Sequence, residues 1–186
     1  MIMAVPDFQV IQLKVTLKHT KPPIWRRVQV RSDISLLQLH DILQVVMGWT
    51  DSHLHQFVIR GKTYTVLDPD CDPSMIDETE VKLDEVIHAP RTKFRYDYDF
   101  GDGWEHELVV EKILPPDPAT HYPVCLDGKL ACPIEDSGGP WGYYEKLKIV
   151  KDPRHPDHAD IVGWMPEDFD PEAFDRQAVN EVLRGM

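Results

Sequence analysis

The residues with the greatest capacity for chemistry lie around a glycine turn in the middle of the chain. Asp99 and Asp102 flank Gly101, and His106 follows a few positions later. Carboxylates beside an imidazole are ligands that suit Zn²⁺, Mn²⁺ or Mg²⁺. Asp99 and His106 lie on opposite arms of a predicted hairpin, so they converge only if the strand register aligns them. The alternative is structural: the aspartates bond turn amides, and His106 covers the core together with Trp104.

Two histidines in an earlier segment form a second group of candidate ligands. His53 and His55 lie in a stretch with strand alternation, which predicts that both project from one face. This spacing suits two metal ligands if their strand lies beside the Asp97–His106 hairpin. The alternative is that both are half-exposed or hydrogen-bonded structural histidines. His40, near the polar side of a predicted helix, is expected to be solvated.

A third candidate segment is an acidic loop rich in glycine. Glu135 and Asp136 precede Gly138 and Gly139, just before a predicted helix. Such a loop can bring the backbone close to a ligand. Equally, it can be a chain crossing whose carboxylates accept backbone N–H bonds. The nearby Cys132 is predicted to be a small buried hydrophobic residue.

Together these segments predict one candidate binding surface. It comprises His53, His55, Asp99, Asp102, Trp104, His106, Glu135, Asp136, Gly138 and Gly139. The candidate metal ligands within it are Asp99, Asp102, His106, Glu135 and Asp136. A divalent metal is the cofactor that these residue types suggest, while catalytic residues stay unassigned because the residues do not complete a catalytic set.

Three hairpins and one principal helix must position these segments. Strand alternation predicts pairs over 8–17 and 24–30, over 53–59 and 63–67, and over 94–100 and 104–114. Ser35 and Gln38 have the spacing of a capping box, and apolar residues then recur at helical spacing until Gly48. Prolines make 115–123 an irregular connection, and further helices are expected over 143–150 and near the C-terminus.

These elements predict an α+β fold. We expect a mainly antiparallel mixed sheet of about six strands built from hairpins, one principal helix packed on it, and C-terminal helices. A single domain is expected over 1–186, with the acidic, proline-rich segment 150–186 packed on it as an extension.

Charge and composition bear on the partner and the compartment. The net charge of −12 disfavours nucleic acid as a partner, although Lys21, Arg26, Arg27 and Arg31 make the first hairpin locally basic. The apolar stretches are too short to cross a membrane, and Met1–Pro6 lacks the features of an export signal. Three cysteines, an odd number, favour a reducing compartment, so we expect a cytoplasmic protein.

Several of these motifs together resemble one family. The stretches are 23–27, 48–49, 53–57, 98–106 and 132–139. They are similar to the plasmid pRiA4b ORF-3-like proteins, and the resemblance runs from about residue 8 to the C-terminus. It implies an α+β domain of bacteria and archaea, sometimes associated with plasmids or mobile elements, and it implies no particular activity.

Three hypotheses about function follow. The first is a cytoplasmic binding or interaction module that uses the candidate surface for an unknown protein or small-molecule partner. The second is a metal-dependent hydrolase or nuclease that uses the Asp/His/Glu cluster. The third is nucleic-acid binding through the basic N-terminal hairpin.

Overall fold

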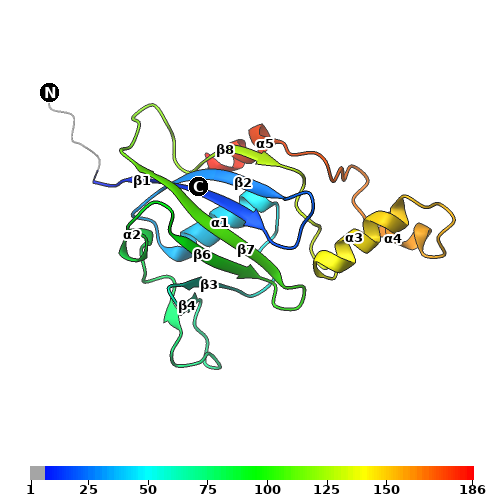
Figure 1. Cartoon of the computed structure of the whole chain (residues 1–186), viewed down its shortest axis with the longest axis horizontal. Helices are drawn as coiled ribbons and strands as arrows, with labels where there is room; N and C mark the ends of the chain where they lie inside the picture. The colour runs from blue at the N-terminus through cyan, green and yellow to red at the C-terminus, as the bar shows by residue number, and fades with distance from the viewer. Residues whose placement is uncertain (1–6) are drawn as a thin grey trace.

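A computed structural model describes residues 7–186, so the Met1–Pro6 segment, expected to carry no export signal, lies outside the described residues. The strands are β1 (Val10–Leu17), β2 (Trp25–Arg31), β3 (His55–Ile59), β4 (Lys62–Thr65), β5 (Ile76–Asp77), β6 (Lys93–Tyr98), β7 (Trp104–Leu114) and β8 (Val124–Lys129). The helices are α1 (Leu36–Met47), α2 (Leu83–Val86), α3 (Gly139–Val150), α4 (His158–Trp164) and α5 (Arg176–Leu183). Figure 1 shows how they are arranged.

The eight strands form one sheet in the order β5-β4-β3-β6-β7-β1-β2-β8. The three predicted hairpins are present as β1–β2, β3–β4 and β6–β7, all antiparallel. The short β5 pairs in parallel with β4, which makes the sheet mixed. The predicted α+β class, with a mostly antiparallel sheet, one early helix and C-terminal helices, is therefore confirmed.

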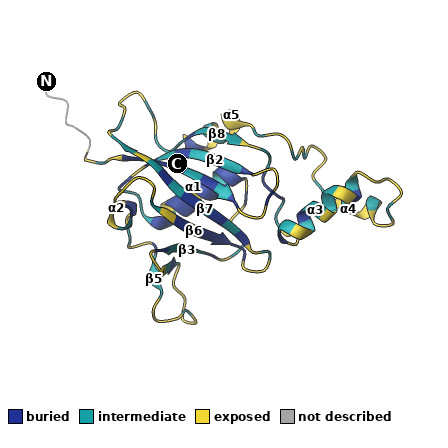
Figure 2. Ribbon diagram, in the orientation of Figure 1, coloured by how far each residue is buried: buried dark blue, intermediate teal, exposed yellow. Residues whose placement is uncertain are grey.

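Helix α1 forms where the capping box predicted it and packs across one face of the sheet (Figure 2). Ser35 accepts a bond from the Gln38 amide, and the Gln38 side chain accepts one from the Ser35 amide. Gly48 ends the helix in the left-handed region, which suits a residue without Cβ. Leu36, Leu39 and other apolar residues of α1 are buried, each worth about 1.5–3 kcal/mol of transfer free energy.

The sheet has eight strands where about six were predicted, because the sequence prediction missed the two-residue β5 and also β8; among the helices it missed α4. The β8 strand follows Pro123 directly, its pattern is only half buried, and it forms the edge of the sheet beside β2. Helix α4 lies in the proline-rich tail and buries no residue. Both elements therefore lack the strong apolar periodicity by which a core element is recognised.

The last third of the chain leaves the sheet and then returns to it. Figure 1 shows α3 and α4 extending away from the sheet, while α5 lies beside β8. The Asn180 side chain pairs with the backbone of Cys125, accepting from its N–H at 2.8 Å and donating to its carbonyl at 2.9 Å. This contact covers part of an edge strand that would otherwise expose unpaired backbone groups. Within residues 7–186, none of the helices is both long and apolar enough to cross a lipid bilayer.

Candidate metal centre

His53, Asp99 and Asp136 converge at the end of the β6–β7 hairpin, and we call them the His53 cluster. His53 Nε2 lies 3.2 Å from Asp136 Oδ1 and 3.7 Å from Asp99 Oδ2. One nitrogen or oxygen donor from each residue lies within 4.8 Å of the other two. The cluster thus offers one imidazole and two carboxylates, a donor set that binds divalent cations.

The local backbone leaves one Asp99 oxygen free to face His53. Asp99 has a φ of 55°, in the left-handed region where aspartate is tolerated better than most residues. Its Oδ1 accepts from the amides of Gly101 at 2.9 Å and Asp102 at 3.2 Å. The Asp99 amide donates to the Leu54 carbonyl at 2.9 Å, which ties this turn to the segment that carries His53.

Two glycines bring the Asp136 loop against the same turn. The Gly138 amide donates to Asp102 Oδ2 at 2.9 Å. Gly139 has a φ of 68°, and a Cβ placed on it would lie 2.4 Å from the Asp102 carbonyl oxygen. Only glycine allows so close an approach of the two backbones. Asp102, Gly138 and Gly139 therefore position Asp136.

Glu135 fastens the loop from the other side. Its carboxylate accepts from the hydroxyls of Tyr98 and Thr50, and also from the Thr50 amide at 3.4 Å. Burial raises the pKa of the Tyr98 hydroxyl, and the bond to Glu135 raises this pKa further. Trp49 adds a bond from its indole N–H to the Pro133 carbonyl at 2.9 Å. Glu135 thus joins three segments, and its carboxylate is already occupied.

His106 and Trp104 belong to the core. Both have no exposed area, and His106 lies opposite Tyr96 in the β6–β7 ladder. His106 Nδ1 lies 3.2 Å from the Tyr96 carbonyl, an acceptor, so Nδ1 carries the proton. Burial lowers the pKa of His106 to about 4, so this imidazole is neutral at physiological pH.

His55 belongs to a separate buried cluster that the sequence analysis did not identify. Its Nε2 donates to Glu78 Oε1 at 2.7 Å, and its ring stacks on His40 at 3.4 Å between centroids. His40 Nε2 lies 2.9 Å from Asp51 Oδ1, and its Nδ1 lies 2.8 Å from the Tyr96 hydroxyl. The expectation that His40 is solvated is wrong, because its side chain is 1% exposed.

This buried cluster is built for hydrogen bonding. The His40 and His55 rings are within 7° of parallel. An imidazole binds a metal along a lone pair in its own plane, so two stacked rings do not point at one ion. Burial, followed by the charge of His55, lowers the pKa of His40 to about 4. The cluster instead holds the loop before His53, because the Asp51 amide also donates to Gln44 Oε1 at 2.9 Å.

The structure therefore divides the predicted surface into parts with different surroundings. Asp99 and Asp136 meet His53, whereas Asp102, Glu135 and His106 bond to their own separate partners. His40 could have been found from the sequence, since it lies four positions after Leu36 and four before Gln44 in the buried stripe of α1. Glu78 follows an acidic loop, and its sequence context carries no comparable signal.

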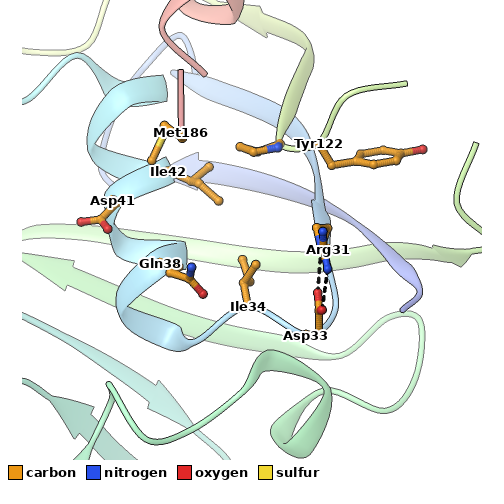
Figure 3. Close-up of a pocket in the computed structure, with 9 residues that line it drawn as sticks. Arg31, Asp33, Ile34, Gln38, Asp41, Ile42, Tyr122 and Met186 are labelled. Carbon is orange, nitrogen blue, oxygen red and sulfur yellow. Dashed lines mark hydrogen bonds and ion pairs between the residues drawn. The ribbon is translucent and has the colours of Figure 1, made fainter. Parts of the chain in front are cut away.

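The basic residues of the first hairpin are largely paired. Arg27 forms an ion pair with Glu111 at 2.7 Å, and Arg31 forms one with Asp33 at 2.7 Å. Figure 3 shows the Arg31–Asp33 pair at the wall of a pocket of about 490 Å³. Arg26 is buried and donates to backbone carbonyls, including that of Val46 at 2.7 Å. These contacts reduce the positive charge that this face offers to a polyanion.

Fold and site together define an α+β protein whose mixed sheet carries a histidine–carboxylate cluster at a hairpin turn. The chain belongs to the plasmid pRiA4b ORF-3-like protein family, whose model matches residues 9–178. It is 40% identical over 176 residues to "Uncharacterized protein y4hQ" of Sinorhizobium fredii (strain NBRC 101917 / NGR234), covering 94% of this chain and 90% of that protein. A solved structure, "Crystal Structure of Protein of Unknown Function MM3350 from Methanosarcina mazei Go1", matches with a TM-score of 0.82 and 38% identity, over 92% of this chain and 97% of that one.

Proposed function

We propose that this protein is a binding module that holds a divalent transition-metal cation at the His53 cluster. One imidazole nitrogen and two carboxylate oxygens suit Mn²⁺, Fe²⁺ or Zn²⁺ better than Ca²⁺, which takes oxygen ligands. Three protein ligands leave further coordination positions for water or for a bound partner. The cation would thereby form the centre of the binding surface.

The observation that carries this proposal is that His53 Nε2 lacks a hydrogen-bond partner. This atom is buried and has no hydrogen-bond partner, although Asp136 Oδ1 lies only 3.2 Å away. Hydrogen bonding therefore does not account for the approach of the imidazole to two carboxylates. A cation between the three donors would satisfy the nitrogen and balance the charge of Asp99 and Asp136.

The surroundings of Glu135 favour binding over hydrolysis. A general base must be free to take a proton from the attacking water. The Glu135 carboxylate already accepts from the Tyr98 and Thr50 hydroxyls. Its observed bonds are those of a residue that fastens loops together.

Metal analysis and titration calorimetry test the proposal on the untagged full chain. The chelator-treated protein should bind about one equivalent of Mn²⁺ or Zn²⁺. Asp99→Asn and Asp136→Asn should each weaken binding at least tenfold, because each removes an anionic ligand. Asparagine tolerates the left-handed backbone that both positions adopt, so both variants should remain folded.

A matched control comes from a histidine–aspartate pair outside the cluster. His155 and Asp157 form an exposed pair at 3.9 Å. Asp157→Asn should therefore leave the affinity for the cation unchanged. Equal cation affinity in wild type, Asp99→Asn and Asp136→Asn would refute the proposal.

A further inference from the structure

Three large apolar side chains lie exposed in the segments that build the His53 cluster. Leu54 is 67% exposed, Phe100 54% and Trp141 90%. Leu54 follows His53 and Phe100 follows Asp99, while Trp141 lies in the first turn of α3, just after the Asp136 loop. Of the three, Trp141 also lines a groove, and a groove with aromatic lining is the usual form of a ligand site.

A groove of about 1160 Å³ begins next to the cluster. Gly103, Pro140, Trp141 and Tyr144 are among its lining residues. Gly103 is one turn from the cluster, because its amide donates to the Asp99 carbonyl at 2.7 Å. Pro140, another lining residue, follows directly after Gly139, whose backbone lies against Asp102. The groove and the cluster are therefore both built from the turn at 99–103 and the loop at 136–140, which contact each other at Asp102.

The charges of the groove differ from those of the cluster. Lys21 and Lys148 line the groove together with Glu145 and Asp152, so with its two histidines counted as neutral, two positive charges balance two negative ones. This balance, with the aromatic wall, favours an uncharged, flat group. A cation at the cluster would instead attract a negatively charged oxygen donor.

We infer that the site binds an organic oxyanion, its carboxylate or phosphate on the cation of the His53 cluster and its flat apolar body against Trp141 in the groove. This inference rests on the proposed function, since the cation supplies the attraction for the oxyanion. To the proposed cation site it adds a class of ligand: the cluster would recognise the charged end of the molecule, and the adjacent groove its apolar end.

Calorimetry on the Mn²⁺-loaded full chain tests this inference with defined probes. 1-Naphthyl phosphate and 2-naphthoate supply the ring with the two kinds of oxyanion, and the tighter probe identifies the headgroup. Inorganic phosphate and acetate supply the oxyanion without the ring and should bind at least tenfold more weakly. Removal of Mn²⁺ should abolish binding of both naphthyl probes. Trp141→Ala should weaken their binding by about tenfold, as expected for loss of an aromatic contact and its buried area.

Trp164→Ala is the matched control. Trp164 is another exposed tryptophan, on α4, where Lys146 lies 5.2 Å from its ring. Its replacement should leave probe binding unchanged, and neither tryptophan substitution should change Mn²⁺ affinity. Normal Mn²⁺ binding with no preference for the naphthyl probes, or with equal probe affinity in Trp141→Ala, overturns the ligand class alone. Failure to bind any divalent cation overturns the proposed function and this inference with it.

Discussion

Lowering the pH should destabilise the folded chain through the buried imidazole of His106. Burial lowers the pKa of His106 to about 4 in the folded state, whereas an unfolded histidine titrates near about 6.5. As the pH falls below the unfolded pKa, the unfolded chain therefore takes up a proton that the folded chain does not. The stabilisation is complete above the unfolded pKa and is lost as the pH falls towards the folded one.

The size of the effect follows from these two values. Between about pH 7.5 and about pH 5, the shift of His106 removes about 2 kcal/mol from the free energy of unfolding. No allowance for solvent screening is needed, because the side chain has no exposed area. For a chain of this length, such a loss lowers the melting temperature by about 4–8 °C.

Urea denaturation of wild type and His106→Gln across this pH range measures the effect. Glutamine keeps a donor for the Tyr96 carbonyl but does not titrate. The wild type should lose about 2 kcal/mol more than the variant, whatever the stability of the variant at neutral pH. The low pKa of His40 acts in the same direction in both proteins and cancels in the comparison. Parallel stability curves for the two proteins would refute this reasoning.

Two further predictions concern the backbone contact and the buried arginine, each measured by urea denaturation. Gly139→Ala should destabilise the chain by about 2 kcal/mol and weaken Mn²⁺ binding, because its Cβ would meet Asp102 from a left-handed backbone. Gly163→Ala, in α4 with open space around it, should instead stabilise it by about 0.5–1 kcal/mol, and the reverse order would contradict the close-contact argument. Arg26→Met should lower the free energy of unfolding by about 3 kcal/mol, because it leaves the buried Val46 carbonyl and the part-buried Lys129 carbonyl without their donor. Arg31→Met, which removes a partly exposed ion pair, should lower it by less than about 1 kcal/mol. Similar losses in the two variants would show that the bonds of Arg26 contribute little.

The sequence predicted the elements whose signals are local. Alternation over one strand and the capping of α1 depend on residues close together in the chain, which is why the three hairpins and the helix were predictable. The strand order was not, because β1 pairs with β7 across a long stretch of intervening chain. The edge strand β8 was missed because its half-buried pattern lacks strong apolar periodicity, and its pairing with the distant β2 was not predictable for the same reason as that of β1 with β7.

For the candidate site, the sequence indicated which residues could bind a metal more reliably than it indicated which of them lie next to one another. The sequence singled out Asp99 and His106 together, but the register pairs His106 with Tyr96 and places it in the core. Asp99 lies beyond the last pair of the ladder, in a left-handed conformation that turns its free oxygen towards His53. Both outcomes depend on strand register and turn conformation. A register shift of one residue would move His106 to the other face of the sheet.

The position of β1 inside the sheet affects how the chain folds while it is being synthesised on the ribosome. The β1–β2 hairpin can form as soon as its residues emerge, but the other edge of β1 waits for β7, whose His106 pairs with Leu17. During that interval a strand rich in buried apolar residues has an open edge, which is the kind of surface that joins nascent chains to one another. Synthesis must therefore pass the middle of the chain before the most apolar strand is protected on both sides.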